Sequence, residues 1–424
     1  MVRNLTRPLL VFLVAAIGFG VWFGRFYHLN LRGAAPALLP PSKGIAESEN
    51  LTGLPLTLPP GFSISIFAKN LGSPRVLARD MTGSLLVSVP ASGKVVALPD
   101  SNNDSAADES ITVVDGLNRP HGLAFRDDQL YIAETNAVAV YDYDSATKKA
   151  INRKKIIDLP GGGNHFSRTI GFGPDGKLYI SVGSSCNACI EDDSRRAAIL
   201  IATMTGSDPV TTKFFASGLR NSVFFTWHPK TKKLWATDMG RDFLGDNLPP
   251  EEINIVEEGK HYGWPYCYGH QVYDIDFDTS KKVEEFCKTT EPSHIEYQAH
   301  SAPLGLAFIP TNVVNPFATA NKLTTSVWPE EYADDLLVAY HGSWNRTEPT
   351  GYKIVRFKLD VKGSYEGAED FITGWFTPAL SGISEDEVFG RPVDLLFDGD
   401  GVLYVSDDKA GVIYRVTPPN MLSN

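Results

Sequence analysis

The sequence feature that most constrains the fold is a phrase that recurs six times along the chain. Each copy has an apolar stretch, a turn rich in Asp and Gly, and a second apolar stretch that stops at polar residues. Alternating apolar residues on both sides of such a turn are typical of β-hairpins. The six copies occupy residues 74–89, 119–134, 167–183, 219–238, 303–342 and 391–408.

The spacing of the copies predicts the architecture. The arginines at the start of the first four copies lie 44, 49 and 52 residues apart, and two longer gaps follow in which loops are inserted. A repeat near 45 residues with about four strands per unit is typical of propeller blades. We therefore expect an all-β, six-bladed β-propeller over residues 61–418, followed by a short tail, 419–424.

The N-terminus has the composition of a targeting segment. Residues 8–24 carry no charge and lie between Arg7 and Arg25. A helix of 17 residues spans roughly 25 Å, slightly less than the bilayer core of about 30 Å. Residues 1–33 are therefore an uncleaved signal anchor or a cleaved signal peptide, and a Pro-rich linker, 34–60, follows. Both alternatives predict an extracytoplasmic body, and the anchor would attach it to a membrane through residues 8–24.

Four cysteines fit an exported chain. Their number is even, and we expect two structural disulfides, Cys186–Cys189 and Cys267–Cys287. A zinc site with four cysteine ligands is an alternative, although the spacing is asymmetric. Attachment of haem c would need His after the CNAC sequence, where this chain has Ile190.

Arginines mark the start of five of the six copies. They are Arg75, Arg119, Arg168, Arg220 and Arg391. The first strand of a blade begins near the propeller axis, so these residues should surround a central cavity and offer a site for an anion. The alternative is that each arginine pairs with a nearby carboxylate. The net charge of −11 excludes a nucleic-acid partner, because neutralising phosphates needs a basic face.

Two further patterns suggest chemistry at the hub. His165 follows three glycines, Gly161–Gly163, and histidine is suited to act as a general base near neutral pH. A structural role for a single histidine beside an aromatic residue is the alternative. Farther along, residues 238–254 combine glycines with acidic side chains, a composition that can bind Ca²⁺ through carbonyl and carboxylate oxygens.

Several motifs in order resemble one known family. They are GFGPDGKLYISVG, GLRN, DMGRD, EEIN, EGKHYGWPYCYG, HGSWNR and GRPV. Over residues 55–418 the chain resembles the glucose/sorbosone dehydrogenases, which are soluble-type sugar dehydrogenases dependent on pyrroloquinoline quinone (PQQ). The HGSWNR and CNAC sequences look closest to the sorbosone and pyranose dehydrogenase branch.

The resemblance implies PQQ and Ca²⁺ as cofactors and assigns roles to individual residues. His165 would take the proton of the sugar C1 hydroxyl while hydride passes to the quinone, with Arg168 beside it. The implied cofactor contacts are Arg220 and Asn221 to the quinone oxygens, and Arg346 and Arg391 to the carboxylates. The implied metal ligands are the backbone carbonyls of Gly240 and Arg241.

Other residues are weaker candidates for substrate contact. Ser184 stands where the glucose enzymes have an acidic residue that touches substrate, which puts glucose itself in doubt. His121, His341 and the aromatic residues Tyr262, Trp264 and Tyr266 could contact a sugar. For His121 and for the aromatic residues a structural role is an equally good interpretation.

The resemblance also implies partners. Electrons would pass to a cytochrome or a membrane quinone and not to NAD. Two rival functions fit the propeller: a gluconolactonase-like hydrolase, which needs acidic metal-binding residues at the hub, and a non-enzymatic NHL-type binding module, which needs neither the glycine-histidine loop nor HGSWNR.

Overall fold

The computed structural model describes residues 47–204, 210–310, 328–378 and 387–419, together with the backbone of 312–313 and 324–325. The apolar stretch 8–24, and with it the prediction of a membrane anchor or signal peptide, lies outside these residues. Within the described part of the chain, no helix is long and apolar enough to cross a bilayer.

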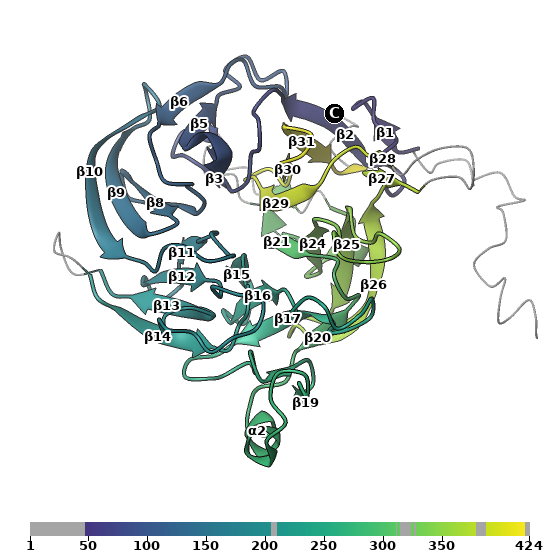
Figure 1. Ribbon diagram of the computed structural model, residues 1–424. Coiled ribbons are helices and arrows are strands. Elements are labelled where there is room, and N and C mark those ends of the chain that lie inside the picture. Colours follow the sequence, from purple (N-terminus) through teal and green to yellow (C-terminus); the bar gives the residue numbers. More distant parts are fainter. Residues whose placement is uncertain are drawn as a thin grey trace, which may run out of the picture. The chain divides into compact units, whose positions relative to one another are not determined.

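Six sheets of four or five strands are arranged in a ring (Figure 1), so the fold is the predicted six-bladed β-propeller. The first blade contains β3 (Leu77–Arg79), β4 (Leu85–Val89), β5 (Lys94–Leu98) and β6 (Ile111–Val114). The second contains β7 (Leu123–Arg126), β8 (Gln129–Glu134), β9 (Ala137–Asp144) and β10 (Lys149–Asp158). The third contains β11 (Ile170–Phe172), β12 (Leu178–Val182), β13 (Ala198–Ala202) and β14 (Thr212–Ser217).

The remaining blades follow the same order from the hub outward. The fourth contains β15 (Phe225–Trp227), β16 (Leu234–Asp238), β17 (Glu251–Val256) and β20 (Ile295–Tyr297). The fifth contains β21 (Pro303–Phe308), β24 (Leu336–Tyr340), β25 (Lys353–Leu359) and β26 (Tyr365–Ile372). The sixth contains β29 (Pro392–Phe397), β30 (Leu403–Asp407), β31 (Val412–Thr417), β2 (Ser63–Ala68) and β1 (Glu49–Asn50).

The repeated sequence phrase forms the two inner strands of each blade. In the first blade β3 pairs antiparallel with β4, with Leu77 opposite Val87, and the other five blades begin with the same kind of pair. The second strands β4, β12, β16 and β24 are buried at every position, because neighbouring blades cover both of their faces. This packing explains why these strands are almost continuously apolar in the sequence.

The ring closes with strands from both ends of the described chain. β2 pairs antiparallel with β31, placing Ser63 opposite Thr417, and β1 adds to β2 in parallel. Leu56 and Leu58 are buried in the core of the fifth and sixth blades. The boundary of the expected linker, 34–60, is therefore wrong in its second half: residues from Glu49 onward belong to the folded body.

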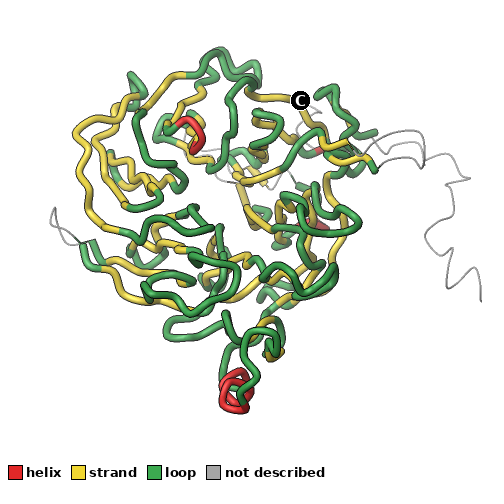
Figure 2. The backbone as a smooth tube through the Cα atoms, in the orientation of Figure 1, coloured by secondary structure: helices red, strands yellow, loops and turns green. Residues whose placement is uncertain are grey.

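The longest described excursion leaves the fourth blade between β17 and β20. It carries β18 (Cys267–Tyr268), β19 (Val272–Tyr273) and the helix α2 (Lys281–Cys287), which extends beyond the ring of sheets (Figures 1 and 2). The Cys267–Cys287 disulfide closes this excursion, and Cys186–Cys189 forms the second predicted disulfide. Both pairings confirm the expectation and exclude the four-cysteine zinc site, because no thiolate is left to bind metal.

Short elements complete the described structure. They are the strand pairs β22 (Asn312–Val313) with β23 (Thr324–Thr325) and β27 (Phe376–Thr377) with β28 (Glu387–Val388), and the 3₁₀ turns η2 (Pro90–Ser92) and η3 (Glu330–Tyr332).

Candidate functional site

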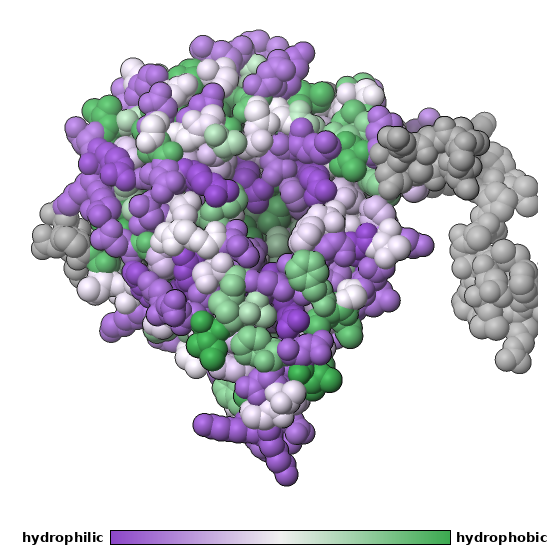
Figure 3. Space-filling model, in the orientation of Figure 1, coloured by the Kyte–Doolittle hydropathy of each residue, from purple (hydrophilic) through white to green (hydrophobic). Residues whose placement is uncertain are grey.

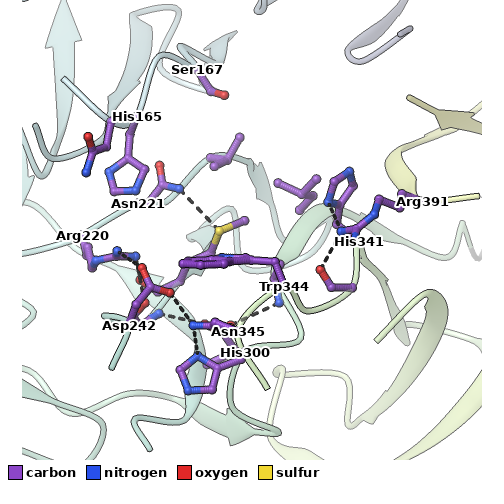
Figure 4. A pocket seen from close by; sticks show the side chains of 18 of the residues that line it. His165, Ser167, Arg220, Asn221, Asp242, His300, His341, Trp344, Asn345 and Arg391 are labelled. Carbon is purple, nitrogen blue, oxygen red and sulfur yellow. Dashed lines mark hydrogen bonds and ion pairs between the residues drawn. The ribbon is translucent and has the colours of Figure 1, made fainter. Parts of the chain in front are cut away.

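A cavity of about 330 Å³ opens at the hub, where Figure 3 shows a hollow. Its wall comes from loops that precede the first strands of blades and from loops that follow the second strands of the fourth and fifth blades. Figure 4 shows the side chains converging from opposite sides of the hub. The charged and titratable residues among the lining are Arg75, His165, Arg220, Asp242, Glu251, His300, His341 and Arg391.

Three of the five strand-start arginines line this cavity: Arg75, Arg220 and Arg391. The alternative of pairing with a carboxylate holds for two of them, because Arg75 pairs with Asp408 and Arg220 with Asp242. The other two strand-start arginines do not line the cavity. The Arg119 guanidinium lies 3.5 Å from the centre of the Phe166 ring, a cation–π contact. Arg168 is fully buried behind the wall.

His165 is held in one tautomer by its neighbours. Its Nδ1 lies 2.9 Å from the carbonyl oxygen and 2.9 Å from Oγ of Ser184. A carbonyl oxygen can only accept, and the Ser184 hydroxyl donates to the Cys186 carbonyl at 2.7 Å. Nδ1 therefore carries the proton and Nε2 carries the free lone pair. His165 lines the cavity in this tautomer, which is the one a general base needs.

Burial keeps the His165 ring neutral. Desolvation, followed by the positive charge of Arg220, lowers the pKa of His165 from 6.5 to about 3. Gly183 makes this close packing possible, because a Cβ there would come within 2.6 Å of Asn221 Oδ1 and 2.7 Å of His165 Cβ. At neutral pH the ring is an unprotonated acceptor.

The loop that carries His165 is fixed from behind by two buried arginines. Arg168 donates to the carbonyls of Pro160, His165 and Ser167, so it holds the backbone and does not reach the cavity. Arg196 donates to the carbonyls of Pro160, Gly161 and Gly162. The resemblance placed Arg168 beside the catalytic histidine; in the structure this proximity is structural support. Arg196 lies outside every motif recognised in the sequence, so its supporting role could not be predicted.

Arg220 and Asn221 are presented to the cavity by one carboxylate. Asp238, at the end of β16, accepts the backbone N–H of Arg220 at 2.9 Å and that of Asn221 at 2.7 Å. Arg220 is 5% exposed, and the five N–H groups of its guanidinium all have protein acceptors, one of them the Asp242 carboxylate at 3.1 Å. Arg220 is thus a fixed cation in the wall.

On the opposite side, Asp408 joins two cavity residues from different blades. It accepts from Arg75 at 2.5 Å and from His341 Nε2 at 2.8 Å. Burial raises the pKa of Asp408, but the hydrogen bond from His341 and the charge of Arg75 outweigh it, so the pKa is lowered. The side chain of Arg391 differs from these residues: the hydrogen bonds of its guanidinium go to neutral groups, including the Gly342 carbonyl at 2.9 Å. Within the described residues it forms no ion pair.

The predicted metal ligands are only partly at the cavity. Gly240 lines it, and its carbonyl oxygen accepts from Arg220 at 2.8 Å. Arg241 is not among the lining residues, and its side chain pairs with Asp274 at 3.0 Å. The carboxyl groups of Asp242 and Glu251 also line the cavity, and a Glu251 oxygen accepts the Gly240 N–H at 2.8 Å. This set of oxygens is the type that Ca²⁺ prefers.

Several predicted contact residues lie away from the cavity wall. Arg346 donates to the carbonyls of Asp246, Ala299 and Glu348. Tyr262 and Trp264 are buried, with the Tyr262 hydroxyl bonded to the Ile255 carbonyl, which supports the packed-loop interpretation. Of the residues predicted to contact substrate or the cofactor carboxylates, those that do not line the cavity are Arg346, Ser184, His121, Tyr262, Trp264 and Tyr266.

His121 and Ser184 are both fully buried. His121 packs between the rings of Phe166 and Phe224. Ser184 contacts His165 and no open space, so its position supports the histidine and does not favour a direct contact with substrate.

Sequence reasoning missed several residues of the wall, among them three with polar or aromatic side chains. His300, Trp344 and Asn345 line the cavity, and Asn345 donates to Asp242 at 2.6 Å. Trp344 is 68% exposed, and its ring crosses the cavity in Figure 4. Trp344 and Asn345 belong to the HGSWNR motif, so the sequence contained a signal for them, although the resemblance pointed only to the His and Arg of that motif.

Comparison with known proteins gives both a family and relatives. The family model described as TrAA12-like matches residues 56–419. A Borreliella burgdorferi protein of uncharacterised function is 30% identical over 377 residues, covering 85% of this chain and 90% of that protein. The pyrroloquinoline quinone-dependent pyranose dehydrogenase of Coprinopsis cinerea is 26% identical over 406 residues. That match covers 84% of this chain but only 54% of the fungal enzyme.

Solved structures share the fold. The PQQ domain of the Coprinopsis cinerea pyranose dehydrogenase, in its holo form, superposes with a TM-score of 0.70 at 22% identity, covering 88% of this chain and 100% of that domain. A calcium structure of a Trichoderma reesei family AA12 protein gives a TM-score of 0.70 at 22% identity, covering 87% of this chain and 99% of that chain. The match of the family model over nearly the whole folded body shows that this chain belongs to the TrAA12-like family.

Proposed function

We propose that this protein oxidises an aldose or a related sugar at C1, with PQQ as the electron acceptor and Ca²⁺ as its activating ion. The observation that carries the proposal is the neutral His165, fixed with Nε2 as the acceptor, in the same cavity as three arginines. Membership of the TrAA12-like family and the PQQ-dependent relatives support it.

The cationic wall fits a tricarboxylate cofactor. Among the described residues the guanidinium of Arg391 has no carboxylate partner, and Nε of Arg75 is buried without a hydrogen-bond partner. Arg391 and Arg75 would hold carboxylates of PQQ, and Arg220 would supply a fixed charge near the quinone oxygens. Arg346 lies outside the wall, so the structure favours Arg391 and Arg75 over Arg346 for this role.

The oxygen groups on the fourth-blade side fit Ca²⁺. The Gly240 carbonyl and the Asp242 and Glu251 carboxyl groups are the candidate ligands. Burial raises the pKa of Glu251 to about 8 in the absence of metal. In the described residues the one tight cluster of potential ligand side chains is Cys186, Cys189 and Glu191, and its cysteines are joined in a disulfide.

Individual residues of the cavity have separate roles in the proposed reaction. When bound, PQQ would supply the two-electron oxidant that converts the sugar to a lactone, and Ca²⁺ would act as the Lewis acid that makes the quinone more electrophilic. His165 Nε2 takes the proton of the C1 hydroxyl, while the Ser184 carbonyl keeps the other nitrogen protonated. Asn345 and Asp242, which are hydrogen-bonded to each other, offer polar groups for sugar hydroxyls at the mouth of the cavity.

The rival functions fit the cavity less well. A hydrolase of the gluconolactonase type needs a metal bound by several acidic side chains, whereas this wall carries more cations than acids. A binding module needs no tautomer-fixed histidine. Reconstitution with PQQ and Ca²⁺ and a dye-linked assay over a panel of aldoses tests the proposal: reduction of the dye by at least one aldose supports it, and none would contradict it.

We also propose that the body works outside the cytoplasm and passes its electrons to a cytochrome or a membrane quinone. The uncharged run of residues 8–24 and the two disulfides support the location, since disulfides persist in oxidising compartments. Cell fractionation tests it. Deleting residues 1–33 should release the protein from the membrane fraction with dye-linked activity intact; a full-length protein found in the cytosol with alkylatable thiols would contradict it.

A further inference from the structure

A small loop closed by a disulfide lies beside the cavity and contacts two of its residues, Arg220 directly and His165 through Ser184. The Cys186–Cys189 disulfide encloses only Asn187 and Ala188. The loop follows β12 and begins two residues after Ser184, and it reaches the loop that follows β16 in the next blade. The sequence suggested only a structural disulfide here.

Two oxygen atoms of Asn187 accept hydrogen bonds from Arg220. Arg220 Nε donates to the Asn187 carbonyl at 2.9 Å, and Nη2 donates to Asn187 Oδ1 at 2.9 Å. A pair of bonds to adjacent guanidinium nitrogens fixes the plane of the group as well as its position. Because the first acceptor is a backbone carbonyl, the conformation of the loop itself determines where the guanidinium lies.

The same side chain ties the loop to the cavity residue Asp242. Asn187 Oδ1 accepts the Asp242 N–H at 2.7 Å, and Asn187 Nδ2 donates to the Asp242 carbonyl at 3.1 Å. From behind, Trp264 Nε1 donates to the Asn187 carbonyl at 3.3 Å. Both oxygens and the amide nitrogen of Asn187 are therefore engaged.

The loop also reaches His165. The Ser184 hydroxyl donates to the Cys186 carbonyl at 2.7 Å, which turns its oxygen lone pairs towards His165 Nδ1. The backbone of residues 186–187 thus has acceptors that orient two different partners, Ser184 and Arg220. A disulfide that closes so short a loop restricts the conformations of these carbonyls.

We propose that Asn187, held by the Cys186–Cys189 disulfide, is the positioning residue that fixes Arg220 in the cavity, and that the same loop fixes the hydrogen-bonding geometry of His165. This inference rests on the proposed function for its catalytic meaning. Its structural content, the placement of Arg220, is testable without any cofactor.

The test compares Asn187→Ala with a matched control. Asn50→Ala also removes a half-buried asparagine, whose side chain makes hydrogen bonds to Thr52, Leu54 and Leu56 in the sixth blade, away from the cavity. Asn187→Ala should weaken PQQ binding about 10- to 100-fold, the range expected for losing hydrogen bonds to a charged group. It should raise the concentration of PQQ needed for half-maximal activity while the KM for sugar at saturating PQQ changes less than threefold. Asn50→Ala should change neither.

Two further variants separate positioning from general damage. Asn187→Asp keeps an Oδ acceptor for Arg220 and should recover most of the PQQ affinity. The Cys186→Ser/Cys189→Ser pair should weaken PQQ binding in the same direction, whereas Cys267→Ser/Cys287→Ser should leave it within about threefold. Equal losses in both disulfide variants would overturn the assignment to this loop.

A crystal structure of cofactor-free Asn187→Ala settles the placement itself. The Arg220 guanidinium should leave its position against the 186–189 loop, and an Arg220 that stays in place would overturn the inference. Should the alanine variant fail to fold, the same comparison is made on Asn187→Asp, where Arg220 should remain in place and lose only the link from Asn187 Nδ2 to Asp242. Failure of wild-type protein to bind PQQ would instead refute the proposed function. The position of Arg220 in the cofactor-free variant would still test whether Asn187 places it.

Discussion

Replacing His165 by alanine is the perturbation whose effect follows most directly from the structure. The change removes Nε2, the free acceptor in the cavity, and leaves Arg75, Arg220 and Arg391 in place. Loss of a general base lowers turnover by about 10²–10⁴, equivalent to roughly 3–5 kcal/mol of transition-state stabilisation. PQQ affinity should stay within about threefold of wild type, because the histidine is not one of the cationic groups of the wall.

A second variant, Ser184→Ala, distinguishes loss of the base itself from a disturbance of its surroundings. Ser184→Ala removes one of the two Nδ1 acceptors and keeps the carbonyl, so the tautomer is retained. One neutral hydrogen bond contributes about 0.5–1.5 kcal/mol, so turnover should fall only about 2- to 10-fold. The assay is dye-linked turnover at saturating PQQ, Ca²⁺ and sugar. Turnover of His165→Ala within tenfold of wild type, or equal losses in the two variants, would refute the assignment of the base.

Three other predictions follow. Arg391→Ala should weaken PQQ binding about 10- to 100-fold in a fluorescence titration, since no carboxylate of the described residues pairs with this guanidinium; unchanged affinity would contradict the anion site. Exhaustive chelation with EGTA should abolish activity, with Ca²⁺ plus PQQ restoring it and Mg²⁺ restoring little, because Mg²⁺ demands strict octahedral geometry; full activity without metal would oppose the calcium proposal. The lowered pKa of His165, about 3 against 6.5, favours the neutral ring in the folded state. The unfolding free energy should therefore fall by about 1.4 kcal/mol per pH unit below pH 6.5 through this group, until about pH 3. Comparing wild type with His165→Gln by denaturant titration isolates that contribution, and identical pH slopes would disprove it.

The blade pattern was readable from the sequence because each blade repeats one local event. The apolar alternation around an Asp/Gly turn specifies the inner strand pair of every blade without any long-range information. Closure of the ring was not readable in the same way: β2 pairs with β31 across more than 300 residues, and its sequence lies outside the repeated phrase. The same limit explains why the expected linker ran into the folded body.

Local sequence also predicted some residues of the site and not others. The position before the first strand predicted the cavity-lining Arg75, Arg220 and Arg391, but the same position in the third blade holds Arg168, which turns inward to the carbonyls of the glycine loop. No local rule separates these outcomes, because the difference lies in which acceptors the fold brings near. Asp408 and Asn187 were missed for the same reason: each acts on residues of another blade.

The central claim is that this cavity oxidises a sugar by passing its electrons to bound PQQ, and a single-turnover spectrum tests it most directly. The protein is loaded with one equivalent of PQQ and with Ca²⁺ without oxygen or dye, and one equivalent of an aldose identified by the dye-linked panel is added. We predict loss of the absorption of the oxidised quinone with formation of one lactone per cofactor, at a rate that falls about 10²–10⁴-fold in His165→Ala. A cofactor that stays oxidised with every aldose, or the same rate in His165→Ala, would contradict the account.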